Sequence, residues 1–249
     1  MAMLGVCCRR IGVAGLVVCR TDNHCISRAL LPGHTTSVPD MATIERLTDS
    51  CLLVTTDSDA TLFDPGFHPF TSGDLDLGSI GDVSRVFITH EHGDHVSPDF
   101  VHWLIDRRSD LTIYSNDAVM SFLRKHDIEV TTSVPSGVSV EDVLHGRIPN
   151  GATPPNRAFT IDGVFTHPGD SREPTATAPV LALPLLVPWD SATGAVEFAR
   201  RLRPSQVVAI HDFYLSESGR GWIRGMVGDV LSADGIELVD IDWGASFTV

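Results

Sequence analysis

The sequence predicts an α/β fold in which sheet and helix layers pack against each other. Short apolar segments of strand-like composition alternate with longer segments whose apolar residues have helical spacing, and this alternation is typical of layered α/β domains. The chain has 249 residues, of which 43% are hydrophobic, so a sizeable core can be buried. We therefore expect one large domain or two small ones.

The part of the chain that follows residue 40 is expected to open as a β-meander and to continue as alternating strands and helices. Asp64-Pro65-Gly66 marks a tight turn after the third strand. Ser97 is a suitable N-cap and Pro98 a suitable first residue for the helix that follows. The expected elements here are strands at 43–47, 51–55, 61–63, 83–89 and 111–114, and helices at 100–107 and 116–125, with a weak helical signal near 74–80.

The second half has a mixed start and a regular end. Residues 134–160 are rich in Pro, Gly and Asn, and we expect short strands and an ordered loop there. Asp162-Gly163 is a strong two-residue hairpin signal. The other expected elements are strands at 159–161, 164–166, 179–187 and 207–210, helices at 192–202 and 221–231, and a last strand at 236–241.

Residues 1–40 differ from the rest of the chain. Arg9 and Arg10 precede a short apolar run at 11–18, which superficially resembles an export signal. The run is interrupted by two glycines, and no small-x-small cleavage site follows it cleanly. We expect a disordered or artefactual extension here, with an export signal as the alternative, and a single folded domain over 41–249.

Composition limits the compartment and the partners. Cys51 is the only cysteine after residue 40, so this part cannot hold an intrachain disulfide framework, and a reducing, cytoplasmic location follows. No apolar run is long enough to cross a bilayer as a helix. The formal net charge of −14 disfavours nucleic acid as a partner and favours a small-molecule substrate. The sequence carries no signal for the oligomeric state.

The main chemical feature is a histidine-rich motif that begins where the apolar strand over 83–89 ends. It reads His90-Glu91-His92-Gly93-Asp94-His95. Neutral imidazoles and a carboxylate together suit a divalent transition metal. His90 and His92 are two residues apart and point the same way at a strand end, whereas Glu91 points away. Asp94 and His95 can face a second position, so the motif favours two metals that share one loop.

This His-x-His-x-Asp-His pattern resembles the hallmark of the metallo-β-lactamase superfamily, and the resemblance runs from about Met41 to the C-terminus. Asp64-Pro65-Gly66 is similar to a family turn, residues 165–171 to the segment that supplies a bridging carboxylate, and residues 208–212 to the strand that ends in the last histidine ligand. The His-Pro-Gly-Asp-Ser form within residues 165–171, with Val-Pro-Trp at 187–189, resembles the branch that includes ascorbate-6-phosphate lactonase. The resemblance implies an αββα sandwich of two mixed β-sheets flanked by helices, with metals at the open edge.

The resemblance also implies a ligand set for two metals. The first metal has a third histidine besides His90 and His92, and His145 is the candidate, with His167 as the alternative. Asp64 is either an outer residue that orients a ligand histidine or a plain turn aspartate, and Trp189 is either a pocket wall or a core residue. The predicted ligands are His90, His92, His145, Asp94, His95 and His211, with Asp170 bridging the two metals.

The expected function is that of a dinuclear metal-dependent hydrolase. A metal-bound hydroxide attacks a small ester, lactone or phosphodiester, and Asp94, the expected catalytic residue, orients it and takes a proton. Zinc is the default metal for histidine and aspartate ligands, with manganese or iron as alternatives because no thiolate is present. The alternative functions are a nuclease or phosphodiesterase of the same superfamily and a non-hydrolytic, iron-dependent redox protein.

Overall fold

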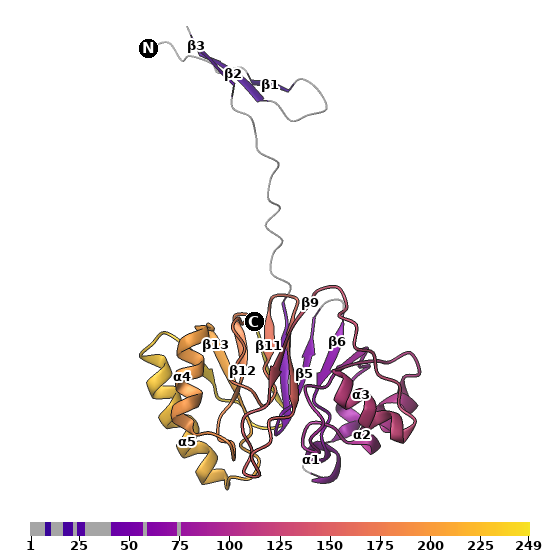
Figure 1. The fold of residues 1–249 in the computed structure, drawn as a ribbon. Coiled ribbons are helices and arrows are strands. Elements are labelled where there is room, and N and C mark those ends of the chain that lie inside the picture. Colours follow the sequence, from indigo (N-terminus) through magenta and orange to yellow (C-terminus); the bar gives the residue numbers. More distant parts are fainter. Residues whose placement is uncertain (1–7, 11–16, 22–23, 28–40, 57–58, 74–75) are drawn as a thin grey trace. The chain divides into compact units, whose positions relative to one another are not determined.

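The computed structural model of the chain describes residues 8–10, 17–21, 24–27, 41–56, 59–73 and 76–249 (Figure 1). The chain divides into two units, Met1–Pro39 and Asp40–Val249. In the first unit, strands β1 (Cys8–Arg10), β2 (Val17–Thr21) and β3 (His24–Ser27) form an antiparallel sheet in that order. Most of residues 1–40 lie outside the described residues, and the nature of this extension stays a prediction.

The second unit contains two six-stranded mixed sheets. In the first sheet, with order β15-β4-β5-β6-β7-β8, the neighbours from β15 to β6 are antiparallel and β6, β7 and β8 are parallel. Its strands are β4 (Thr43–Thr48), β5 (Cys51–Thr55), β6 (Ala60–Phe63), β7 (Arg85–Phe87), β8 (Thr112–Tyr114) and β15 (Ala245–Thr248).

The second sheet has the order β14-β13-β12-β11-β10-β9. Its neighbours from β11 to β14 are parallel, and β9, β10 and β11 are antiparallel. Its strands are β9 (Val138–Leu144), β10 (Pro155–Ile161), β11 (Phe165–His167), β12 (Val180–Pro184), β13 (Gln206–Ile210) and β14 (Glu237–Val239).

Helices cover the outer face of each sheet, which confirms the αββα sandwich (Figure 1). Helices α2 and α3 pack on the first sheet, and α4 and α5 pack on the second. Within the described residues, no helix combines the length and the apolar character needed to cross a membrane. The helices are α1 (Phe67–Thr71), α2 (Pro98–Arg107), α3 (Asp117–Leu123), α4 (Ala192–Leu202) and α5 (Glu217–Ser232), with 3-10 turns η1 (Leu77–Ser79) and η2 (Arg124–His126).

Three apolar layers follow from the alternation of side chains along the strands. On β12, Val180 and Ala182 face the core between the sheets, whereas Leu181 and Leu183 face α4 and α5. β5 alternates in the same way between the central core and the layer under α2 and α3. The central strands are thus buried on both faces, which is why they read as continuous apolar runs in the sequence.

Several predicted boundaries needed correction. The strand over 236–241 is not the last, because β15 follows it and pairs with β4. Helix α1 was not predicted, and α5 begins at Glu217, four residues before the expected start. Ser97 caps α2 through a 3.4 Å hydrogen bond from the Phe100 N–H, as predicted. The weak helical signal near 74–80 corresponds to η1.

Candidate metal centre

The predicted ligands lie in loops that leave one end of the two sheets. His90 follows β7, His145 follows β9, Asp170 follows β11 and His211 follows β13. Strands that run parallel end at the same edge, so β7 presents its loop beside β6, and β11 and β13 present theirs on either side of β12. The topology therefore brings residues more than 100 positions apart to one edge, as in other open α/β sheets.

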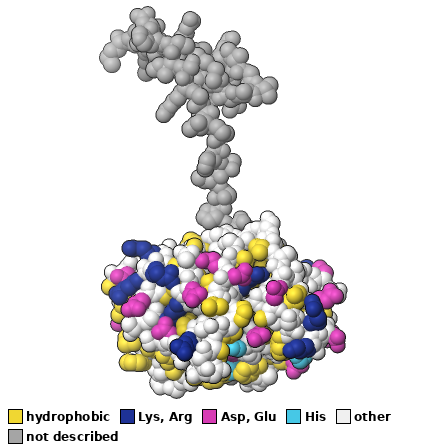
Figure 2. All heavy atoms as spheres, viewed as in Figure 1, with side chains coloured by type: hydrophobic (Ala, Val, Ile, Leu, Met, Phe, Trp, Pro, Cys, Tyr) yellow, Lys and Arg dark blue, Asp and Glu magenta, His cyan; other side chains and the backbone are white. Residues whose placement is uncertain are grey.

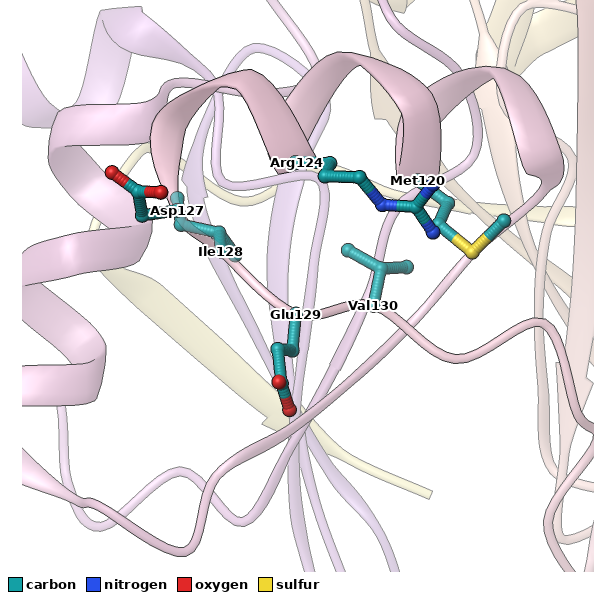
Figure 3. Close-up of a pocket in the computed structure, with 6 residues that line it drawn as sticks. All are labelled: Met120, Arg124, Asp127, Ile128, Glu129 and Val130. Atoms are coloured by element: carbon teal, nitrogen blue, oxygen red, sulfur yellow. The ribbon is translucent and has the colours of Figure 1, made fainter.

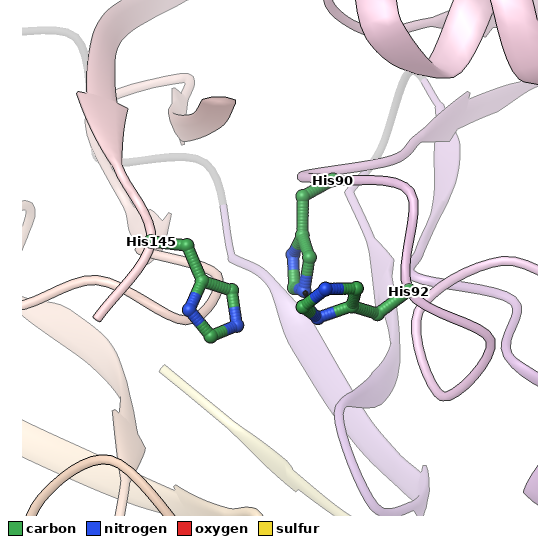
Figure 4. A group of neighbouring side chains, drawn as sticks. All are labelled: His90, His92 and His145. Carbon is green, nitrogen blue, oxygen red and sulfur yellow. Dashed lines mark hydrogen bonds between the residues drawn. The ribbon is translucent and has the colours of Figure 1, made fainter. Parts of the chain in front are cut away.

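Three histidines form the first group of candidate ligands. Nε2 of His90 lies 3.1 Å from Nδ1 of His92, and the ring centroids of both lie within 4.8 Å of the His145 ring. One nitrogen of each ring lies within 4.8 Å of one nitrogen of the other two. Figure 4 shows the three imidazoles converging on a common space.

Asp94, His95 and His211 form the second group, with one ligand atom of each within 4.8 Å of the others. Asp170 lies between the two groups. Its Oδ1 is 3.4 Å from Nε2 of His95 and 2.5 Å from Nε2 of His211, whereas its Oδ2 is 3.0 Å from Nε2 of His145. The structure thus brings all seven predicted ligands into one cluster.

The polar atoms of this cluster fit a bound cation. Four of them are buried without a hydrogen-bond partner: Nε2 of His95, His145 and His211, and Oδ1 of Asp170. Some approach one another closely, but in directions that do not suit a hydrogen bond. Buried polar atoms are almost always satisfied. Lone pairs that converge on one space from imidazoles and carboxylates are satisfied by a divalent metal, so the residues present fit the metals implied by the motif.

The protonation states of the cluster suit a bound cation. Burial lowers the pKa of His90 well below its usual value, so this imidazole is a neutral donor. Burial raises the pKa of Asp170, but the neighbouring His211 and His95 outweigh it and hold this pKa well below the usual range. Burial lowers the pKa of His211, yet Asp170 and Asp49 bring it to about 9. An anionic Asp170 at the centre is suited to bind a cation.

Asp64 contacts both ends of the segment from Thr89 to His95 and so fixes the histidine-rich motif. Its carboxylate accepts hydrogen bonds from the Thr89 N–H at 2.7 Å and the Thr89 hydroxyl at 2.8 Å, and it contacts Nδ1 of His95 at 2.6 Å. Asp64 is therefore placed to orient a candidate ligand histidine and is not a plain turn residue. Gly66 is needed beside it, because a Cβ there would lie 1.9 Å from the carbonyl oxygen of Asp94.

His167, the alternative third ligand, is turned away from the cluster. Its Nε2 lies 2.9 Å from the Ser50 carbonyl oxygen and its Nδ1 accepts the Gly169 N–H at 3.1 Å, so both ring nitrogens have other partners. His102 is also remote from the ligands, with its Nε2 on the carbonyl of His126.

Three supporting residues were not recognised from the sequence as neighbours of ligands. Asp49 has both oxygens buried without a hydrogen-bond partner, and its Oδ1 lies 3.5 Å from Nδ1 of His211. Asn156 accepts the Asp170 N–H at 3.1 Å, and the indole N–H of Trp189 donates to Oδ2 of Asp170 at 3.1 Å. No local pattern marks Asp49 or Asn156, and the Val-Pro-Trp pattern did not indicate that Trp189 contacts Asp170, because each contact joins distant segments.

A separate surface hollow of about 450 Å³ lies next to α3 and η2 (Figure 3). None of its lining residues belongs to the ligand cluster. The residues are Met120, Arg124, Asp127, Ile128, Glu129 and Val130.

Fold and ligand cluster together define a class of protein, and comparison with known proteins names it. Residues 45–181, more than half of the chain, match the model of the metallo-beta-lactamase superfamily. The chain belongs to this superfamily. Family and cluster together confirm the prediction of a metal-dependent hydrolase.

The chain is also similar to individual proteins. Protein Rv0786c of Mycobacterium tuberculosis is 26% identical over 200 residues, which cover 74% of this chain and 91% of that protein. Two solved structures share the fold over 84% of this chain. YhfI of Bacillus subtilis, a metallo-beta-lactamase fold protein, is 15% identical with a TM-score of 0.64 and is covered completely. Igni18, a metallo hydrolase of Ignicoccus hospitalis, is 17% identical with a TM-score of 0.62 and is covered to 98%.

Proposed function

We propose that the protein is a dinuclear metal-dependent hydrolase that acts on a small ester, lactone or phosphodiester. The observation that carries the proposal is the position of Asp170, whose two oxygens face different histidines: Oδ1 faces His95 and His211, and Oδ2 faces His145. A carboxylate with this arrangement is suited to be shared by two cations. We further propose that the protein belongs to the branch of the superfamily that includes ascorbate-6-phosphate lactonase.

Each residue of the cluster has a proposed role. His90, His92 and His145 would hold the first metal, Asp94, His95 and His211 would hold the second, and Asp170 would contribute to both. A bound pair of divalent metals supplies a nucleophilic water at neutral pH and polarises the oxygen under attack. Zinc suits this ligand set best, and manganese or iron remain alternatives because no thiolate contributes.

Asp94 is the proposed catalytic residue. Its side chain is 25% exposed, whereas those of His95 and Asp170 are at most 7% exposed, so Asp94 is reached from solvent. Its backbone carbonyl is fixed by a 3.0 Å hydrogen bond from the Ser50 hydroxyl. A solvent-accessible carboxylate on a fixed backbone is suited to orient the attacking water and to accept its proton as the bond to the substrate forms.

A small molecule in the cytoplasm is the proposed substrate. The formal net charge of the chain is −14. On the face shown in Figure 2, acidic and basic side chains are interspersed over the described part of the chain. A protein that holds nucleic acid by its phosphates needs a concentrated basic face. A nuclease function is therefore disfavoured.

Two substitutions test the proposal. His92→Ala removes a ligand from the first group, and Asp170→Asn removes the shared anion, so each should lower kcat/KM by about 10³-fold or more, since the reaction depends on the metals. Zinc-loaded full-length chain is assayed with an aliphatic lactone, an aryl ester and a simple phosphodiester, and circular dichroism checks that both variants fold. Retained turnover in both folded variants would contradict the proposal.

The same screen separates the substrate classes. Turnover of the lactone alone supports the lactonase branch. Turnover of the phosphodiester alone revives the nuclease alternative, which salt-sensitive RNA binding then tests. A coloured, iron-loaded preparation that hydrolyses none of the three substrates would favour redox chemistry.

A further inference from the structure

Trp189, in the loop between β12 and α4, contacts two of the candidate ligands, His145 and Asp170. Its indole Nε1–H donates to Oδ2 of Asp170 at 3.1 Å. The same carboxylate oxygen is 3.0 Å from Nε2 of His145, and the rings of His145 and Trp189 meet edge to face with centroids 5.8 Å apart. The tryptophan therefore contacts a ligand of the first group and the shared carboxylate together.

The indole ring is held from two sides. A Cβ on Gly146 would lie 2.1 Å from the ring, so only glycine allows the loop after His145 to pass this close. The Arg172 guanidinium lies over the ring, 5.3 Å from its centroid, and its NH1 is fixed by Asp190 at 2.7 Å. Few ring orientations remain, and the one observed directs the N–H at Asp170.

The two oxygens of Asp170 have different surroundings as a result. Oδ1 faces His95 and His211 and is buried without a hydrogen-bond partner. Oδ2 receives the indole N–H and faces His145. Rotation of the carboxylate about its Cβ–Cγ bond would break the indole hydrogen bond. The N–H thus fixes the plane of the carboxylate, so that one oxygen points to His145 and the other to His95 and His211.

We propose that Trp189 is a positioning residue that fixes the orientation of Asp170 through its indole N–H and thereby supports metal binding at the group of His90, His92 and His145. The inference rests on the proposed role of Asp170 as a shared ligand. Residues that hydrogen-bond to metal ligands typically raise metal affinity by about 10- to 100-fold.

Trp189→Phe is the informative substitution, because it removes the N–H and retains an aromatic ring between Gly146 and Arg172. Trp243→Phe is its matched control. Trp243 is also half-buried and also carries an arginine over its ring, with Arg220 4.1 Å from the centroid. Its Nε1 is buried without a hydrogen-bond partner among the described residues, so the control removes an N–H that makes no hydrogen bond there.

Zinc titration of the metal-free, full-length chain by calorimetry provides a readout that is independent of activity. We expect two binding steps in the unsubstituted protein, and in Trp189→Phe one step weakened by about 10- to 100-fold with the other weakened less. Trp243→Phe should keep both steps. In the His92→Ala background, where the first group is already incomplete, Trp189→Phe should have little further effect, since the two changes act on the same site.

Thermal unfolding of the metal-free proteins separates positioning from packing. The proposal requires Trp189→Phe without metal to unfold close to the temperature of the unsubstituted protein, with no more than the loss expected for one hydrogen bond. Two unchanged binding steps in Trp189→Phe would overturn it, as would equal weakening of both steps in a variant that unfolds early. These outcomes leave the proposed function intact if the unsubstituted chain binds two zinc ions, whereas a chain that binds none contradicts both.

Discussion

Asp64 contacts a ligand histidine from a position where it is fully buried, and it links the first sheet to the histidine motif. It accepts two hydrogen bonds from Thr89 and contacts Nδ1 of His95. Its φ of 45° lies in the left-handed region, which aspartate tolerates better than most residues. Backbone strain of this kind is retained where the surroundings fix the geometry, as they do here.

Asp64→Asn should weaken zinc binding by about 10- to 100-fold while the protein still folds, because an amide cannot accept hydrogen bonds at its nitrogen and loses the charge beside His95. Competition with a chromophoric chelator measures the affinity. Asp110→Asn is the control, since Asp110 is exposed and, among the described residues, pairs with Arg108 alone. Equal zinc affinity in the two variants would show that Asp64 does not orient its histidine.

At this scale the sequence predicted the residues that carry chemistry better than those that support them. The motif from His90 to His95 is local, so its residues were predictable from spacing and residue type. His145 was chosen over His167 from its place in the chain and from the hairpin-like segment 156–163 that follows it. The structure places His145, and not His167, beside His90 and His92. Asp49 and Asn156 carried no local signal, because their contacts join loops that only the fold brings together.

At the scale of elements, a buried ion cluster joins β4, α5 and the loop after β13. Asp212, the residue after His211, pairs with Arg46 of β4. It also accepts hydrogen bonds from Nε and NH2 of Arg224 in α5, at 2.8 and 2.6 Å. The side chains of these three residues are at most 5% exposed. The cluster therefore connects the loop of the last candidate ligand, His211, to β4 of the first sheet and to α5, which packs on the second sheet.

Asp212→Ala should lower the free energy of unfolding by about 3–5 kcal/mol, because it leaves two buried guanidinium groups without their shared partner. Urea unfolding followed by circular dichroism measures the change. Asp110→Ala removes the partner of an exposed pair and should cost at most about 1 kcal/mol. A loss in Asp212→Ala no larger than in this control would mean that water replaces the carboxylate.

The elements that were missed are short or depend on distant pairing. Helix α1 has five residues and contains Pro69, so no helical period can be read from it. Strand β15 has four residues and is defined by its pairing with β4, about 200 positions earlier. Helices α2 and α4 had clear apolar periods, α2 also had a cap signal in Ser97, and both were predicted within two residues.

At the scale of the whole molecule, the metals should couple the two sheets. Residues from the loops after β7 and β9 form the first group of ligands, and those after β7 and β13 form the second, so each group draws on both sheets. The sandwich core between the sheets is apolar and unspecific in direction. The ligand cluster adds directed contacts at one edge, and these exist only in the folded chain.

Metal removal should therefore destabilise the whole domain and not only the site. A ligand that binds the folded state alone contributes about 4 kcal/mol when it is present at roughly 1,000 times its Kd. For a domain of this size, that corresponds to about 8–16 °C in Tm for one metal. Scanning calorimetry of zinc-loaded and chelator-treated full-length chain measures the shift. His92→Ala should show a smaller shift, because one group is incomplete, and an equal Tm with and without zinc would mean that the metals do not hold the two sheets together.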